Sequence, residues 1–424
     1  MVVRDKIQYY SSIHFCIFGK KCTINFMKLI IHTRWLLYQT IFALLTCALF
    51  TQFSVAFAEI RYPRTQSLNH SMTKIAEVME QLFPLITDDR YSKTEIDTIK
   101  KHVQRLEKLF SGVGHDIKKK SDAYQISYTY ISEYLDNILF DFEKNRIRFA
   151  LGRLQNIGEI CISCHTQDKQ FRTIFKNQSN NNFADDMAQA EFNFITRNYL
   201  IAESFYQNAL KKLDSNSTNK IQFIARRLIV IYTQVLDNIN EGGVSLKKAL
   251  NISISDQKVV EYLNGLIEGL TMLQEAGVSH ASAISFNEIE SLVTKYLGAY
   301  LTVTPVFYST PQEEVGRVWL RGMLYHYLNT AAQKKEMPYL LYWLSLTTRS
   351  IGYNYDYVLA DFYIKECMQR YSKHEFAKSC YNEYERYVTF YYTNPLETVL
   401  PIEIDRELKK YKKMVFHKKR KRLR

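Results

Sequence analysis

Apolar residues recur along most of this chain at intervals of three and four positions, the spacing that places them on one face of an α-helix. The clearest run is Ile96, Ile99, Val103, Leu106 and Phe110. Little of the sequence alternates strictly between apolar and polar residues, as a half-buried strand does. Proline and glycine number only 7 and 14 in 424 residues, so few positions interrupt a helix. The pattern predicts an all-α protein.

Four of the predicted helices lie within residues 61–176 and are connected by short segments. Ser92 and Glu95 have the spacing of a capping box, which begins the second helix, and Gly112 and Gly114 are expected to end it. Short connections between helices of similar length favour an antiparallel, up-down-up-down four-helix bundle. We expect the four helices near residues 67–86, from 93 to the two glycines, near 122–143, and from 145 onward.

A second helical region, residues 183–408, follows the polar linker 177–182. Ala202, Tyr206 and Ala209 match one half of a tetratricopeptide (TPR) repeat helix, and a helix at 188–197 precedes them as its partner. No strict 34-residue period continues, so the sequence predicts a degenerate TPR-like stack, an architecture that presents a concave surface to partner proteins. Further helices are expected near 221–238, 258–276, 285–301, 313–332, 338–351, 357–371 and 375–392.

The fourth helix of the bundle carries the motif with the most specific chemistry, Cys161-Ile162-Ser163-Cys164-His165. Cys-x-x-Cys-His is the attachment site of a covalent c-type haem. The two thiols share a helix face and reach the two vinyl groups of one porphyrin, and the adjoining imidazole becomes the proximal iron ligand. A redox-active cysteine pair would need a thioredoxin-like βαβ context. A zinc site would need a second ligand pair, and the next cysteine along the chain is Cys367.

The position of this motif near the end of a fourth helix resembles that in class II c-type cytochromes, the cytochrome c-prime type of four-helix bundle. Small class I cytochromes c carry the motif near their N-terminus instead. The resemblance covers residues 61–176, and the chain departs from that family by continuing far beyond the bundle. It implies one covalent haem c packed between the helices. It also implies an iron that is either five-coordinate or bound by a methionine of the first helix as sixth ligand.

The topology of such a bundle ranks the candidates for the sixth ligand. The end of the fourth helix lies beside the start of the first helix and beside the loop between the second and third. Met72 is at this end and is our first candidate. Met79 lies about 10 Å further along the helix axis, and a methionine on an apolar stripe is also explained by packing alone. His70 and His115 are further candidates at the haem end, and an open position is the remaining alternative.

The N-terminal residues carry an export signal displaced from Met1. Met27 begins a short basic segment, which an apolar stretch at 36–50 and an Ala-x-Ala cleavage site ending at Ala58 follow. We expect residues 1–58 to comprise an upstream extension and a signal peptide, with translation starting at Met27 and cleavage after Ala58. This implies a periplasmic protein. The alternative is an uncleaved membrane anchor, because residues 36–58 are long enough to span a bilayer.

The net charge of +13 is concentrated at the C-terminus, where residues 409–424 hold ten Lys or Arg and no acid. Such a tail can bind an anionic membrane surface or an acidic partner protein. The alternative is a solvated C-terminus without a partner. No nucleic-acid-binding motif accompanies the charge, so nucleic acid is not an expected partner.

Two cysteines outside the motif, Cys367 and Cys380, fall on helices that the pattern places face to face around a turn at 372–374. In an oxidising compartment this arrangement favours a disulfide. Two buried free thiols are the alternative.

These features together predict an exported electron carrier and not an enzyme. The second helical region is expected to dock a redox partner protein. A different class, a haem-based sensor or small-gas binder with an open sixth iron position, is the alternative. A third hypothesis is a structural adaptor in which haem stabilises the bundle. Peroxidase chemistry would need an acid-base group beside an open iron, and only His70 or His115 could supply one.

Overall fold

A computed structural model describes residues 70–86, 91–117, 122–166, 183, 185–214, 217–250, 254–279, 284–302, 309–351, 357–393 and 399–416. Leu68–Arg424 form one compact unit. The expected start at Met27 and the cleavage after Ala58 lie outside the described residues. None of the described helices is both long and apolar enough to cross a membrane.

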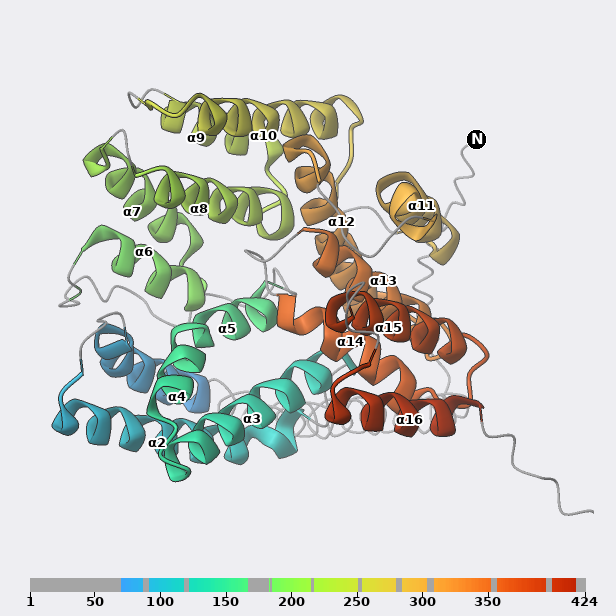
Figure 1. Cartoon of the computed structure of the whole chain (residues 1–424). Coiled ribbons are helices and arrows are strands. Elements are labelled where there is room, and N and C mark those ends of the chain that lie inside the picture. The colour runs from blue at the N-terminus through green and yellow to red at the C-terminus, as the bar shows by residue number, and fades with distance from the viewer. Residues whose placement is uncertain are drawn as a thin grey trace, which may run out of the picture. The chain divides into compact units, whose positions relative to one another are not determined.

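The prediction of an all-α protein is confirmed, because the described residues form helices and connecting turns without a strand (Figure 1). The first helix is described over residues 70–86. The others are α2 (Lys93–Ile117), α3 (Asp122–Glu143), α4 (Ile147–Gln155), α5 (Ile157–His165), α6 (Asp186–Ile195), α7 (Tyr199–Lys212), α8 (Thr218–Ile229), the π-helix η1 (Val230–Val235), α9 (Ile239–Leu250), α10 (Gln257–Glu275), α11 (Phe286–Thr302), α12 (Pro311–Thr330), α13 (Met337–Ser350), α14 (Tyr357–Arg370), α15 (Ala377–Tyr392) and α16 (Ile402–Phe416).

The start of α2 is as the sequence predicts, but its end is not. The Ser92 N–H donates to Glu95 Oε2 at 2.7 Å, and the Glu95 N–H donates to Ser92 Oγ at 3.2 Å, which completes the capping box. The expected stop at Gly112 and Gly114 is wrong, since α2 continues to Ile117. A Cβ on Gly114 would stand 2.9 Å from Cζ of Tyr128 on α3. This glycine therefore allows close packing rather than ending the helix.

The fourth predicted helix is divided at Asn156 into α4 and α5. The Asn156 N–H bonds back to the Arg153 carbonyl at 3.0 Å, and its side-chain amide donates to the Gly152 carbonyl at 3.0 Å. Asparagine competes for backbone partners in this way and therefore often interrupts helices. The cysteine motif consequently lies on a separate nine-residue helix, which contacts α3, α4 and α6.

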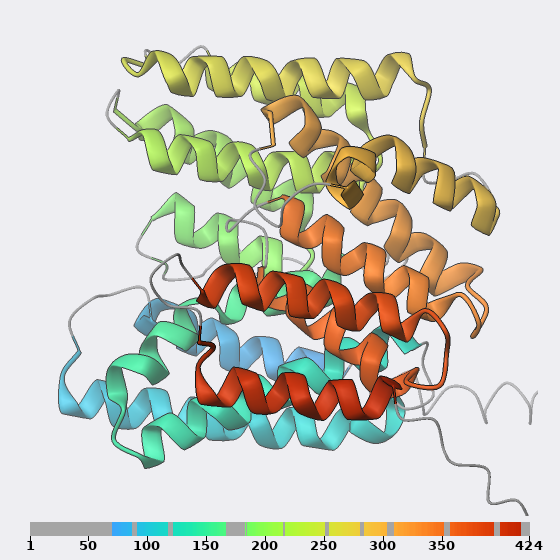
Figure 2. The ribbon, with the colours of Figure 1, turned by 45° about the vertical axis from the view of Figure 1, so that its right-hand side comes forward.

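The later helices pack mainly against their neighbours in the chain, as α6 does with α7, α9 with α10, α13 with α14 and α15 with α16 (Figure 2). Two of them, α9 and α16, are not among the predicted helices. The first part of the expected C-terminal tail, residues 409–416, belongs to α16, where Tyr411 and Val415 are buried. Helices of the second region also contact the first, since α12 and α14 reach α3.

Cys367 on α14 and Cys380 on α15 are joined by a disulfide, with their Cα atoms 6.4 Å apart. Both residues are fully buried. The bond ties together two helices that the short turn at residues 371–376 already brings side by side.

Candidate functional site

The five residues of the motif, Cys161–His165, are the last five of α5. Cys161 and Cys164 are half-buried and are not joined in a disulfide, and His165 is the final helical residue. Thr166 closes the helix, because its N–H and its hydroxyl both donate to the Ile162 carbonyl at 2.8 Å. The helix end that presents His165 is therefore firmly hydrogen-bonded.

A small cavity of about 30 Å³ separates α5 from the first helix. A volume of that order holds roughly one water molecule. This space is therefore too small for a porphyrin without a rearrangement of the elements that line it. The cavity is lined by Met72, Ile75, Ala76, Met79, Cys161, His165, Ile195 and Thr196.

The cavity brings together two of the four candidates for the sixth ligand. Met72 and Met79 line it opposite His165, Met72 half-buried and Met79 only 3% exposed. The first helix thus presents one thioether near its start and a second two turns later to the same space. His70 is exposed and is not part of the lining. The side chain of His115 lies outside the described residues.

The ring of His165 is held as a neutral imidazole. Its Nδ1 is hydrogen-bonded to the Ile195 carbonyl. A carbonyl only accepts, so Nδ1 carries the proton and Nε2 keeps its lone pair. The pKa of His165 is lowered to about 3, mainly by burial and also by the positive charge of Arg197, while the bond to the Ile195 carbonyl partly opposes both effects. A neutral imidazole whose other nitrogen donates to a carbonyl is the usual form of a metal-binding histidine.

The turn between α6 and α7 covers the other side of the motif. Its residue Arg197 is buried with a positive φ of 69°. Burial raises the pKa of the Cys164 thiol, while the Arg197 charge and a hydrogen bond with Ser127 lower it. Tyr199 donates its hydroxyl to the His165 carbonyl at 3.2 Å, and burial raises its pKa. The sequence analysis did not identify these residues, since no local pattern connects them with the motif.

The donor set fits a c-type haem. It offers two thiols three residues apart, a neutral imidazole with a free Nε2 and thioethers on the facing helix. Among the described residues no group of three or more His, Cys, Asp or Glu converges as a metal site. One imidazole and one thioether suffice as the axial protein ligands of a haem iron.

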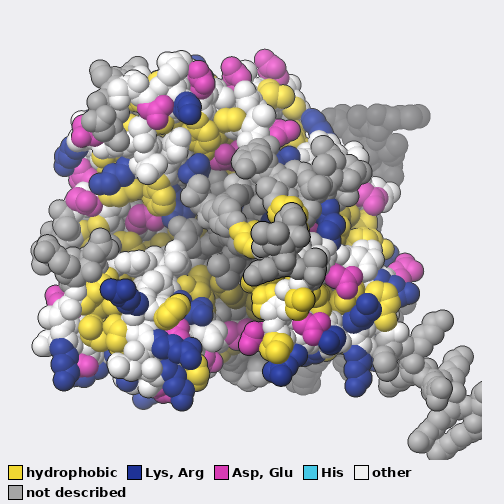
Figure 3. All heavy atoms as spheres, in the orientation of Figure 1, with side chains coloured by type: hydrophobic (Ala, Val, Ile, Leu, Met, Phe, Trp, Pro, Cys, Tyr) yellow, Lys and Arg dark blue, Asp and Glu magenta, His cyan; other side chains and the backbone are white. Residues whose placement is uncertain are grey.

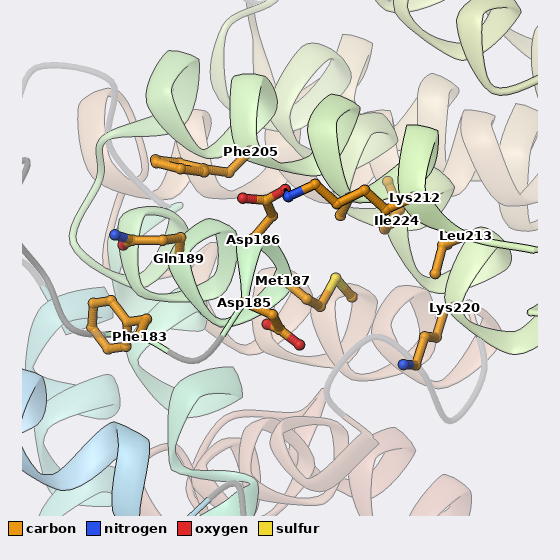
Figure 4. Close-up of a pocket in the computed structure, with 11 residues that line it drawn as sticks. Phe183, Asp185, Asp186, Met187, Gln189, Phe205, Lys212, Leu213, Lys220 and Ile224 are labelled. Atoms are coloured by element: carbon orange, nitrogen blue, oxygen red, sulfur yellow. Dashed lines mark ion pairs between the residues drawn. The ribbon is translucent and has the colours of Figure 1, made fainter.

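A larger cavity of about 440 Å³ lies between α6, α7 and α8 (Figure 4). Among its lining residues, Lys212, whose side chain is 73% exposed, forms an ion pair through Nζ with Asp186 Oδ2 at 2.6 Å, and Asp185 accepts from the Ala188 N–H at the start of α6. No residue of the cysteine motif contributes to it. Its apolar wall consists of Phe183, Met187, Phe205, Ala209, Leu213 and Ile224.

The last helix gives the described surface a mixed basic and apolar character. Lys409 and Lys412 are 73% and 63% exposed on α16, and Met414 and Phe416 beside them are also exposed. Over α15 and α16 in Figure 3, hydrophobic side chains lie among Lys and Arg side chains.

Comparison with protein-family models, with curated proteins and with solved structures finds no match for this chain.

Proposed function

We propose that this chain is an exported c-type cytochrome that carries one covalent haem c and transfers electrons. The observation that carries the proposal is the state of His165 at the end of the Cys-x-x-Cys-His helix. Its ring is a neutral imidazole whose Nδ1–H donates to the Ile195 carbonyl. An iron-binding imidazole needs one unprotonated ring nitrogen, and this tautomer leaves Nε2 unprotonated beside the two cysteines of the motif.

The chain's own residues have distinct roles in this proposal. Cys161 and Cys164 hold the porphyrin by thioether bonds, and His165 offers Nε2 as the proximal ligand. Met72 is the proposed sixth ligand, with Met79 as the other thioether on the same cavity. When bound, the haem supplies an iron that alternates between the ferric and ferrous states. A thioether stabilises the ferrous state and raises the reduction potential.

The finer architecture is part of the same proposal. We propose that residues 61–176 form a bundle of the class II cytochrome c type and that residues 183–408 form a degenerate TPR-like stack that docks a redox partner protein. The proposed role is that of an electron carrier, not an enzyme. A disulfide between Cys367 and Cys380 supports an oxidising compartment such as the periplasm, which covalent haem attachment and the expected signal at residues 27–58 also favour.

The basic C-terminus, residues 409–424, is proposed to contact an anionic membrane surface. The six Lys and Arg among residues 418–424 and the exposed Met414 and Phe416 that precede them support this proposal, because basic charge and apolar side chains act together at a lipid interface. The protein should sediment with phosphatidylglycerol vesicles at low salt and not with phosphatidylcholine vesicles. Binding unaffected by replacing the basic residues of 418–424 with Gln would contradict the proposal.

Two measurements on the exported protein test the haem proposal. Mass spectrometry of the denatured chain should show the added mass of one haem, and this should disappear in the Cys161→Ala, Cys164→Ala double variant. The matched control is Cys367→Ala with Cys380→Ala, which also removes two cysteines but should keep the haem. Covalent haem surviving the first double replacement would defeat the proposal.

The optical spectrum separates the leading function from the gas-binding alternative. A low-spin spectrum that carbon monoxide leaves unchanged favours electron transfer. A high-spin spectrum that changes rapidly with carbon monoxide indicates an open sixth position, and the chain would then be a sensor or small-gas binder.

A further inference from the structure

A π-helix interrupts the helix that starts at Thr218. Its six residues, Val230–Val235 (η1), are all buried. Such π-helical segments are rare within α-helices and are frequent at functional sites. Gln234 lies within η1 and is only 2% exposed. A primary amide this deep in the protein needs partners for both its donor and its acceptor atoms.

Gln234 finds these partners on two distant parts of the chain. Its Nε2 donates to Thr166 Oγ1 at 2.7 Å, and its Oε1 accepts from Arg321 Nε on α12 at 3.0 Å. All three residues are buried. Thr166 directly follows His165 and closes α5, so the amide links the end of the haem helix to the second helical region.

Two further hydrogen bonds connect His165 with the second helical region. The Ile195 carbonyl at the end of α6 accepts from Nδ1 of the ring, and Tyr199 on α7 donates to the His165 carbonyl. The ring, the backbone and the following residue are therefore each held by a group from beyond residue 182. The helices preceding α5 supply none of these three bonds.

We infer that the second helical region forms the proximal side of the haem site and fixes the orientation and basicity of His165, with Gln234 as the positioning residue. The inference rests on the proposed function. Donation from Nδ1 to a carbonyl makes the imidazole a stronger ligand, which favours ferric iron and lowers the reduction potential. Loosening α5 from η1 weakens that bond, because the ring then moves relative to the Ile195 carbonyl. A conformational change in the second helical region, including one caused by partner binding, thereby alters the reduction potential of the iron.

The test uses the full haem-bearing chain with Gln234→Met, a substitution of similar size that removes both hydrogen bonds. We expect the reduction potential to shift to a more positive value. We also expect the Nδ1 proton of His165 to exchange with solvent about tenfold faster by NMR, the effect of losing one hydrogen bond of ordinary strength. The matched control is Thr233→Val. Thr233 is equally buried in η1, and its hydroxyl donates to the Ile229 carbonyl. This variant should lower stability while leaving the potential and the exchange rate unchanged.

A second pair of variants keeps the inference testable if Gln234→Met does not fold. Thr166→Val removes the acceptor of the Gln234 amide and should shift the potential in the same direction. Thr166→Ser keeps the hydroxyl and should restore the native value. Gln234→Met and Thr166→Val combined should shift the potential no further than one of them alone, since both remove the same link. A potential and an exchange rate unmoved by Thr166→Val and Gln234→Met would overturn the inference.

Failure of the proposed function is distinguishable from failure of this inference. If the native chain carries no haem, the proposed function fails. The haem-free chain still answers the positioning question through the nitrogen shifts of His165. The ring should be almost entirely protonated on Nδ1 in the native chain and in Thr233→Val, and should be a mixture of tautomers in Gln234→Met. A mixture already present in the native chain would overturn the inference.

Discussion

Truncating the two methionines that line the cavity with His165 should have different effects on the haem spectrum and on stability. Met72→Ala should remove the sixth ligand, convert the spectrum to high-spin and let carbon monoxide bind rapidly. Met79→Ala should leave the spectrum unchanged and lower the stability instead. The difference follows from position, because both side chains line the same cavity but Met79 is 3% exposed and packed into the core.

The structure gives the size of each effect. Truncating a buried methionine to alanine costs about 2–5 kcal/mol. The cavity of about 30 Å³ beside Met79 is already present in the native protein and adds nothing to this difference. We therefore expect about 2–5 kcal/mol for Met79→Ala. Met72 is half-buried, and its truncation in the haem-free chain should cost about 1–2 kcal/mol.

The assay combines optical spectra of the ferric and ferrous protein with urea denaturation of the haem-free chain. Three results would refute the reasoning. A native spectrum that is already high-spin would mean that neither methionine binds iron. An unchanged spectrum in Met72→Ala would point to His70 or His115. A high-spin spectrum in Met79→Ala alone would make Met79 the ligand.

Three further predictions concern stability, pH and oxidation. Gly269→Ala would place a methyl 3.0 Å from the α12 backbone and should cost about 1–3 kcal/mol, whereas Gly112→Ala meets nothing within 4 Å and should add about 0.5–1 kcal/mol in urea denaturation. Because burial lowers the pKa of His165 to about 3, the unfolded haem-free chain binds a proton more readily below pH 6.5. Stability should fall as the pH drops from 6.5 towards 3 by about 3–5 kcal/mol more than in His165→Gln, and parallel curves would contradict the assignment. Thiol counting on unfolded, unreduced mature haem protein should find no free thiol at Cys367 and Cys380, and two would show the bond absent.

The helical pattern of the sequence was sufficient for the class of fold because it is a local property. The Ser92–Glu95 capping box and the helix at residues 122–143 depend on residues within a few positions of one another. The end of α2 does not. Glycine has a low helix propensity, but at Gly114 it leaves room for the ring of Tyr128 from α3, and the helix continues past it. In α16 the signal was present, as Leu408, Tyr411 and Val415 form a buried stripe, but the dense basic charge concealed it.

In the candidate site, too, some residues could be identified from the local sequence and others could not. The cysteine motif is local and could be read directly, as could the two methionines of the first helix. The groups that orient His165 could not, because Ile195 is 30 residues away and Gln234 is 68 residues from Thr166. One signal existed. Gln234 follows the apolar run 228–232, and an amide within such a run must find buried partners, although the sequence does not say which.

The break between α4 and α5 at Asn156 affects the order in which the helices of this protein fold. Helices shorter than about 12–15 residues are barely stable in water on their own, and α5 has nine. We therefore expect residues 157–165 to be largely unwound until α6, α7 and η1 have docked. In the proposed cytochrome, an attachment enzyme would then meet Cys161 and Cys164 on an accessible peptide. The groups that hold His165 come from residues further along the chain, so haem attachment would precede the docking of these helices.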